Sequence, residues 1–368
     1  MVSDLDLTHV TRLQCELRTL GDLCTFNSNP MKFSLVLPAL VPLIAVGPLS
    51  AVAQSNVTLY GIVDAAAAIE KTGAPGSSRR LVLNSGNQSS SRLGFRGTED
   101  LGDGFKAIFA LEAGIGLDTG TSDAAFFGRR AIVGLEGGLG TLTLGREYSP
   151  IAAVAGAADI LGQGFFGTNL SAFATNRLTR RLSNSINYKT PAFGGVKASF
   201  AVSAAEQTAP GRVIGAALEY TAEPLYLGAG YHAVRRLASA DDKEYALGAG
   251  YNFGAFDVKA NYLVADQAQP GNKFEQFNIG ASVMVGTGRL YANVQQNKLQ
   301  TGAKGMAYAL AYAYPMSKRT NLYATYASLR NNASGVFGLN SASTSVAPPV
   351  AAPGADPSVL ALGVRHSF

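Results

Sequence analysis

Apolar and polar residues alternate with a period of two along most of the chain after residue 54. In residues 57–64 the odd-numbered positions are apolar or small, and in residues 105–113 every odd-numbered position is apolar. Successive side chains of a β-strand point to opposite faces of the sheet, so each such segment has one apolar and one polar face. The pattern therefore predicts an all-β chain built from two-faced strands.

The strand pattern recurs about sixteen times, in segments of about ten residues bounded by turn-forming residues. Short connections such as residues 101–104, 137–140 and 223–224 are rich in the Gly, Pro or Asp that tight turns need. They alternate with longer connections such as residues 71–87 and 331–357. The predicted strands are 56–70, 88–100, 104–117, 127–137, 140–147, 180–190, 195–204, 212–222, 225–235, 243–253, 256–265, 273–285, 289–299, 304–314, 320–330 and 358–368.

An even number of strands, with short turns at one end and long loops at the other, is typical of a barrel that spans an outer membrane. In such a barrel the apolar face meets lipid, and the closed sheet satisfies every backbone hydrogen-bonding group internally. A soluble sandwich would turn the same faces the other way, and alternation alone fits both. The polar set favours the barrel because these residues would share one lumen: Thr58, Arg92, Arg96, Lys106, Glu112, Arg130, Ser183 and Asn187.

The first 53 residues have a different character. Residues 31–53 begin with a positive charge, continue as an apolar run over 33–49 and end in a small-x-small cleavage site, which predicts a secretory signal peptide. Three prolines interrupt the run and argue against a membrane helix. We expect the mature chain to begin at Gln54, and residues 1–30 to be an N-terminal extension created by a start codon assigned too early.

Composition and charge narrow the class further. Charged residues make up only 15% of the chain and Gly reaches 42 residues, which suits many short strands and turns. Both cysteines, Cys15 and Cys24, precede the predicted signal, and their spacing matches no metal or redox motif. Removing residues 1–53 takes away three basic and four acidic residues and raises the formal net charge from +5 to +6. No clustered basic patch points to nucleic acid, and no motif points to a cofactor or metal.

The longest internal connection, residues 147–180, lies between Arg146 and Arg181. A loop of this length is uncommon in a compact domain unless it has a function. Its residues are mostly small and neutral, and Asp159 is its only aspartate. We expect this third long loop to fold into the barrel and narrow it against a wall of arginines.

The mature chain resembles the sixteen-stranded general porins of Gram-negative bacteria, most closely those of beta-proteobacteria. The resemblance rests on a series of motifs in a fixed order, which are QSNVTLYG at 54–61, SRLGFRGTEDLG at 91–102, FGRRA at 127–131, VGL at 133–135, LGR at 144–146, NSINY at 184–188 and a terminal GVRHSF at 363–368. It implies a homotrimer in the outer membrane, in contact with lipid and lipopolysaccharide, with one pore in each barrel and an inward-folded third loop. It also implies that Phe368 is read by the barrel-assembly machinery.

Strand parity assigns candidate constriction residues. Leu93 and Phe95 would face lipid, which turns Arg92 and Arg96 to the lumen. The same argument turns Arg130 inward, and Arg129 outward. It also turns the following residues to the lumen: Glu112, Arg181, Ser183, Ser185 and Asn187.

Arg146 falls outward by strict alternation, whereas the resemblance implies that it faces the lumen. A β-bulge at Gly145 would reconcile the two, because a bulge adds one residue and changes the parity. Asp159 and Glu112 are the candidate acids opposite or beside the arginines. Rings of arginine favour anions, so the sequence predicts a general diffusion porin with mild anion selectivity.

Other classes fit the sequence less well. A substrate-specific channel should show a row of lumenal aromatics or a dense series of acids, and neither is clear. A surface adhesin barrel would use the loops at 71–89 and 331–357, whose composition predicts exposed, mobile segments. A hydrolase would need a histidine-centred site, but the mature chain has only His232 and His366, both within predicted strands. We therefore expect no enzymatic activity.

Overall fold

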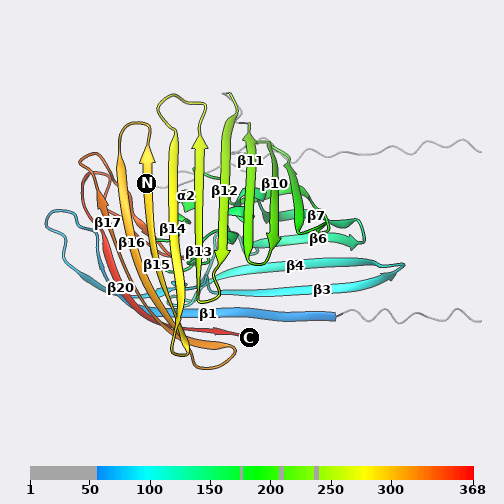
Figure 1. Cartoon of the computed structure of the whole chain (residues 1–368), viewed down its shortest axis with the longest axis horizontal. Helices are drawn as coiled ribbons and strands as arrows, with labels where there is room; N and C mark the ends of the chain where they lie inside the picture. The colour runs from blue at the N-terminus through cyan, green and yellow to red at the C-terminus, as the bar shows by residue number, and fades with distance from the viewer. Residues whose placement is uncertain (1–55, 175–176, 207–210, 236–239) are drawn as a thin grey trace, which may run out of the picture. The chain divides into compact units, whose positions relative to one another are not determined.

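A closed antiparallel β-barrel makes up most of the described chain (Figure 1). The computed structural model describes residues 56–174, 177–206, 211–235 and 240–368. The predicted extension and signal peptide lie outside these ranges. Within them, sixteen strands each pair with the next, and the last barrel strand pairs with the first. The predicted sixteen-stranded antiparallel barrel is confirmed.

Most strands lie within a few residues of their predicted positions. The barrel strands are β1 (Asn56–Lys71), β3 (Arg92–Gly102), β4 (Phe105–Gly116), β6 (Arg130–Gly137), β7 (Gly140–Tyr148), β8 (Arg181–Lys189), β9 (Val196–Ser203), β10 (Val213–Ala222), β11 (Leu225–Val234), β12 (Asp242–Asn252), β13 (Phe256–Asp266), β14 (Phe274–Val285), β15 (Gly288–Leu299), β16 (Lys304–Pro315), β17 (Thr320–Asn331) and β20 (Ser358–Ser367). The connections hold shorter elements, which are β2 (Arg80–Ser85), β5 (Thr121–Ser122), β18 (Leu339–Asn340), β19 (Ser345–Val346), α1 (Pro150–Ala157) and α2 (Ser171–Ala174). Neither helix, nor any other in the described ranges, has the length and hydropathy to cross a bilayer.

The second barrel strand starts later than predicted, at Arg92 rather than residue 88. The preceding residues leave the sheet because the buried carboxylate of Asp64 accepts hydrogen bonds from the backbone N–H groups of Gln88 (3.0 Å) and Ser89 (2.7 Å). Strand β2 lies within a connection predicted to be a loop, and it pairs with the C-terminal half of β1, from Ala65 to Glu70. Strands β2 and β3 therefore pair with successive parts of β1, and the turn between them surrounds the Asp64 carboxylate.

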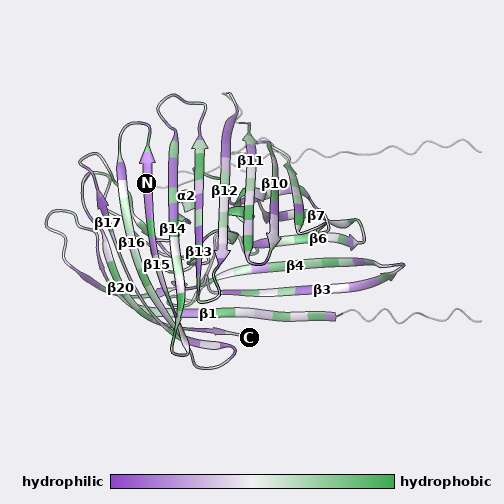
Figure 2. Cartoon of the chain, viewed as in Figure 1, coloured by the Kyte–Doolittle hydropathy of each residue, from purple (hydrophilic) through white to green (hydrophobic). Residues whose placement is uncertain are grey.

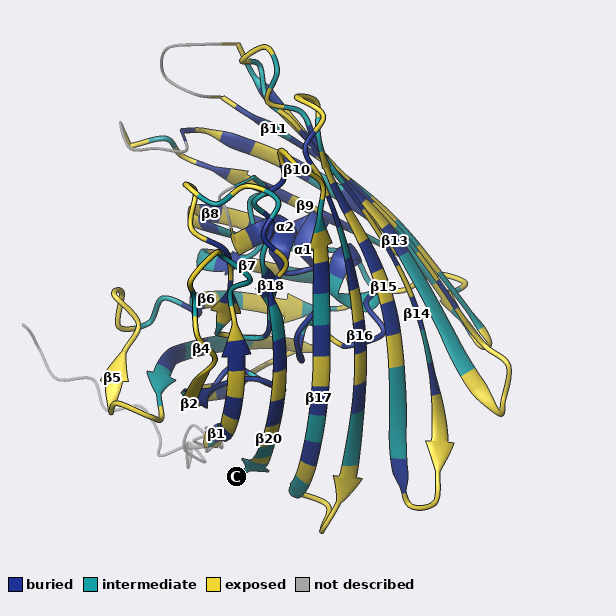
Figure 3. Ribbon diagram, turned by 90° about the vertical axis from the view of Figure 1, so that its left-hand side faces the viewer, coloured by how far each residue is buried: buried dark blue, intermediate teal, exposed yellow. Residues whose placement is uncertain are grey.

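Hydrophobic and hydrophilic residues alternate along the barrel strands (Figure 2), and the exposed fractions show that the apolar residues face outward and the polar ones inward. Val133 and Leu144 on the outer face are 58% and 49% exposed, whereas Asn278 on the inner face is fully buried. Along β16 and β17, buried and exposed positions alternate (Figure 3). A continuous exposed apolar surface of this kind is stable only against lipid, so the alternation reflects a membrane barrel rather than a soluble sandwich.

The two ends of the barrel sheet meet at Phe368. Its backbone N–H donates to the Gly61 carbonyl and its carbonyl accepts from the Gly61 N–H, both at 3.1 Å. A Cβ on Gly61 would lie 2.3 Å from the Phe368 ring, so the ring occupies the space left by the missing side chain. The terminal residue thus completes the closure that lipid requires.

The ladder between β7 and β8 is irregular at the position expected from the sequence. Gly145 pairs with Ser185 and Glu147 with Leu182, so two steps along β7 match three along β8. The ladder is therefore irregular beside Gly145, but the expectation of an extra residue on β7 is wrong: the extra residue lies on β8, where Asn184 has a φ of 52°, so the alternation along β7 is not shifted. Gly145 itself has a φ of 119°, and a Cβ there would lie 2.2 Å from the carbonyl oxygen of Ala131.

We expect Gly145→Ala to destabilise the barrel by about 1–3 kcal/mol, because the new residue would be strained at positive φ and would clash with a backbone oxygen. The temperature at which the folded band disappears in heat-modifiability gels measures the loss. Gly138→Ala is the matched control, since a Cβ at that turn position meets nothing within 4 Å. Equal transition temperatures for the two variants would contradict the prediction.

Candidate functional site

The loop between β7 and β8, residues 149–180, enters the barrel and is called the inward loop here (Figure 3). The sequence predicted no regular structure in it, but it contains α1 and α2. Ser149 caps α1 by accepting from the Ala152 N–H at 3.3 Å, and Pro150 occupies the first turn, where its missing N–H costs nothing. A glycine in the wall lets the helix approach, since a Cβ on Gly248 would lie 2.6 Å from the Ala158 side chain.

A buried His–Glu pair holds both limbs of the inward loop. The Ile151 N–H donates to Nε2 of His232 (3.4 Å), so Nδ1 carries the ring proton and donates to Glu244 (3.1 Å). The other limb is held by Glu244, which accepts from the backbone N–H (3.0 Å) and the hydroxyl (2.8 Å) of Thr179. His232, which the sequence left as an ordinary barrel residue, therefore anchors the loop. No sequence motif around His232 or Glu244 indicates that these residues would contact the inward loop.

An amide-rich patch of the wall receives the tip of the loop. Nδ2 of Asn261 donates to the Ala158 carbonyl and Nδ2 of Asn293 to the Gly167 carbonyl, both at 2.9 Å. Gln276 donates to the Ser171 hydroxyl at 2.7 Å. This patch was not among the residues predicted from the sequence. The signal was present as Asn and Gln at alternate, inward positions of β13, β14 and β15.

The structure places Asp159 inside the loop, where it is 1% exposed. Its carboxylate accepts from the Leu161 N–H (3.0 Å), the Gln163 N–H (3.2 Å) and the Thr168 hydroxyl. Burial raises the pKa of this carboxyl, and the hydrogen bonds partly offset that effect. The expectation that Asp159 offers an opposing charge to the lumen is therefore wrong, because the loop uses this carboxylate for its own fold.

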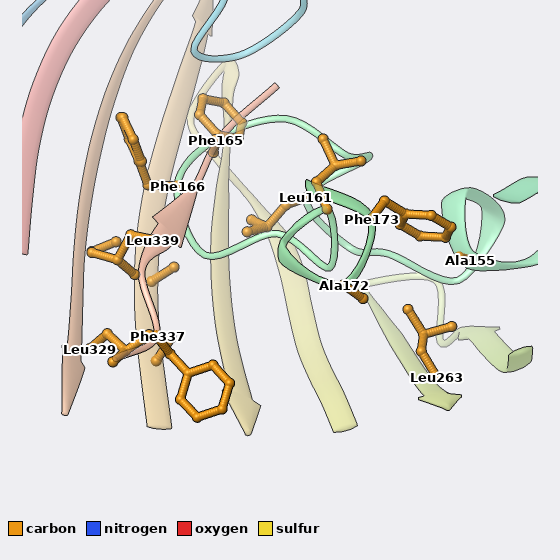
Figure 4. Packing of buried hydrophobic residues seen from close by; sticks show 14 of the residues in the cluster. Ala155, Leu161, Phe165, Phe166, Ala172, Phe173, Leu263, Leu329, Phe337 and Leu339 are labelled. Atoms are coloured by element: carbon orange, nitrogen blue, oxygen red, sulfur yellow. The ribbon is translucent and has the colours of Figure 1, made fainter. Parts of the chain in front are cut away.

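The connection between β17 and β20, residues 332–357, is called the last loop and also turns into the barrel. Its short hairpin, β18–β19, lies on the inward loop, where the Gly167 N–H donates to the Asn340 carbonyl at 3.0 Å. Phe337 and Leu339 are buried in the same apolar cluster as Phe165 and Phe166 (Figure 4). The expectation of an exposed segment is wrong for these buried residues, which composition does not reveal, whereas other parts of the last loop are exposed, such as Val350 at 86%.

Arginines gather on the wall formed by β3 to β8. Glu112 holds two of them, with Nε of Arg129 at 2.7 Å and Nε of Arg92 at 3.5 Å, and accepts from the Tyr60 hydroxyl at 3.2 Å. Arg130 is paired with Glu147 at 2.5 Å. The parity argument that turned Arg129 away from the lumen is wrong. Arg129 precedes the first residue of β6, so strand alternation does not extend to it.

Arg146 and Arg181 extend this group at the start and end of the inward loop. Arg146 donates to the Gly128 carbonyl (2.6 Å) and to the Ser183 hydroxyl (2.5 Å). Arg181 donates to the Arg129 carbonyl (3.0 Å) and to the Tyr148 hydroxyl (2.8 Å). Their partners are uncharged, so both guanidinium groups keep an uncompensated positive charge.

Arg180 also belongs to this group, although the sequence analysis missed it. It donates to Gln163 at 3.0 Å, and burial lowers its pKa to about 10, which leaves it charged at neutral pH. Its position next to Arg181 at the end of the loop was the available signal. We call the group the arginine cluster, and its members are Arg92, Arg129, Arg130, Arg146, Arg180 and Arg181.

Cavities adjoin the arginine cluster on both sides. A cavity of about 350 Å³ lies between the inward and last loops and is lined by Arg180 and Arg181. A cavity of about 370 Å³ on the short-turn side is lined by Arg96 and Arg130. Arg96 lies over the ring of Tyr60 at 5.2 Å and is exposed. Arginines therefore line both cavities.

Comparisons with known proteins agree with this architecture. The model of the family described as Gram-negative porin matches residues 39–334. Outer membrane porin protein 32 of Delftia acidovorans is 35% identical, over 92% of this chain and 100% of that protein. An outer membrane porin of Bordetella pertussis is 30% identical, over 77% and 91%. The structure of an anion-selective porin from Comamonas acidovorans has a TM-score of 0.77 at 32% identity, over 86% of this chain and 100% of that one.

A closed barrel with an apolar exterior, a polar interior and loops that narrow the interior is a transmembrane diffusion pore. This chain belongs to the Gram-negative porin family, as its resemblance to the general porins predicted. It is an outer-membrane protein through which small hydrophilic solutes and ions pass by diffusion.

We expect His232→Phe to loosen the inward loop, because the buried Ile151 N–H loses its acceptor at a cost of about 1–3 kcal/mol. The open loop should be populated roughly 5- to 150-fold more often. Trypsin cleavage after Arg177 and Arg180 in the folded barrel, followed by mass spectrometry, measures this opening. Glu275→Gln, which alters a carboxylate near the long-loop end of β14, is the control. Cleavage as slow in His232→Phe as in the wild type would show that the pair does not hold the loop.

Proposed function

We propose that this porin is a general diffusion pore whose constriction favours anions. The supporting observation is the charge balance of the narrow region. Six guanidinium groups of the arginine cluster are accompanied by two carboxylates, Glu112 and Glu147. The only carboxylate of the inward loop is buried within it. Arginines with few acids favour anion passage.

The proposed constriction has distinct parts. Arg92, Arg146 and Arg181 carry the field at the narrowest level, and Glu112 fixes the guanidinium of Arg92 in place. Arg130 and Arg96 continue the positive wall toward the short-turn end, where both line the lower cavity. Asp159 contributes through the shape of the loop rather than through its charge. The relative from Comamonas acidovorans that is described as anion-selective, at 32% identity, supports the same direction of preference.

We also propose the assembly that the porin resemblance implies, a homotrimer surrounded by lipid and lipopolysaccharide. The last strand would be read by the barrel-assembly machinery through Phe368. Two features support this role, since residue Phe368 is 44% exposed and its backbone closes the sheet. We propose no enzymatic activity, because His232, the only histidine beside the inward loop among the described residues, anchors that loop.

We expect Arg92→Glu to lower the anion-to-cation permeability ratio by about three- to tenfold, because it replaces a positive charge with a negative one beside the solute path. Reversal potentials in planar bilayers under a salt gradient measure the ratio. Arg319→Glu, in an exposed turn, makes the same charge change away from the path and should alter the ratio much less. A wild-type preference for cations, or equal effects of the two variants, would contradict the proposal.

We propose that export removes the signal peptide at residues 31–53, which leaves Gln54 as the first residue of the mature chain. N-terminal sequencing of the protein recovered from outer membranes tests this directly. A first residue before Gln54 would show that the signal peptide is assigned incorrectly.

A further inference from the structure

One arginine of the inward loop lies outside the arginine cluster. The guanidinium carbon of Arg177 lies 4.2 Å from the ring centroid of Phe274 and 5.3 Å from that of Phe337. Phe274 belongs to β14 and Phe337 to the last loop, and both are buried. Arg177 is therefore held between the barrel wall and the last loop by the faces of two aromatic rings.

No carboxylate compensates this charge within the part of the chain that the structure describes. None of the ion pairs formed there includes Arg177. Burial alone lowers the pKa of Arg177 to about 10, which keeps it charged at neutral pH. A partly buried cation without a counter-charge is unfavourable, and a bound anion would relieve that cost.

A cavity lies beside this guanidinium. It has a volume of about 180 Å³ and is lined by Arg177 together with the polar side chains of Ser171, Asn297, Asn340 and Ser345. This space holds more than one water molecule, which occupies about 30 Å³ in the liquid. Asn340, Ser345 and Ala174 also line the larger cavity that contains Arg180 and Arg181. The two cavities are therefore adjacent, and the Arg177 site lies next to the space lined by Arg180 and Arg181.

We propose that this cavity is a binding site for a small oxyanion, carried either by inorganic phosphate or by the carboxylate of an organic acid. The guanidinium supplies the charge, and the hydroxyl and amide groups supply neutral hydrogen-bond donors. The bound anion bridges the inward loop, β15 and the last loop. It stabilises the packing of the two loops on each other, at a place set aside from the arginines of the constriction.

Arginine modification in the folded wild-type protein tests the site. Phenylglyoxal is applied in chloride, phosphate or acetate at equal ionic strength, and adducts are mapped by mass spectrometry. Phosphate, acetate or both should lower the adduct yield at Arg177 at least several-fold relative to chloride, and the active anion identifies the source. Arg319, in an exposed turn, should show no change. An unchanged yield at Arg177 in all three salts, or no adduct in any of them, would overturn the proposal.

Calorimetric titration of the solubilised protein with inorganic phosphate separates this site from the constriction. Arg177→Gln should lose the binding component that Arg92→Gln retains, and Arg177→Lys should recover part of it. If Arg92→Gln loses the phosphate-binding component and Arg177→Gln retains it, the anion binds at the constriction and the proposal is overturned. Because the titration does not measure ion preference, a failure here is distinguishable from a failure of the proposed anion selectivity.

Discussion

Lipid offers no partner for a backbone N–H or carbonyl group, and this constraint governs the whole molecule. It requires a closed sheet, and closure requires that the first and last strands pair. Strands β1 and β20 pair from Ile62–Ser367 at one end to Lys71–Ser358 at the other. It also fixes the face of each side chain, because the exterior must be apolar and the interior is left for polar groups. The alternation along the chain is the direct consequence of that requirement.

A polar interior creates a second problem, since a wide barrel of sixteen strands leaves an open tube. The inward loop fills one side of it. Small residues of α1 pack on a glycine-containing wall, amides from β13 and β15 bind the loop carbonyls, and His232 with Glu244 holds both limbs. The last loop then packs on the inward loop through Phe337 and Leu339. Two of the remaining cavities are lined in part by residues of the arginine cluster.

The electrostatic character of that space follows from which charges are used internally. The Asp159 carboxylate accepts hydrogen bonds from groups of its own loop. Glu147 is paired with Arg130, and Glu112 forms ion pairs with both Arg92 and Arg129. Arg146, Arg180 and Arg181 donate only to neutral groups. The field is therefore set less by the number of arginines than by the shortage of free carboxylates near them.

The sequence alone determined the barrel, its strand positions and the inward direction of Arg92, Arg130 and Glu112, because a two-residue period and turn residues are local signals. An irregularity beside Gly145 was expected only from the resemblance to porins, and the structure places its extra residue on β8. The tertiary structure decided what depends on contacts between distant segments. It buried Asp159, brought Arg129 onto Glu112, made His232 a loop anchor and placed Arg177 between two phenylalanines. Alternation predicts the face to which a side chain points only within a strand. No local pattern shows which distant groups will meet inside the barrel.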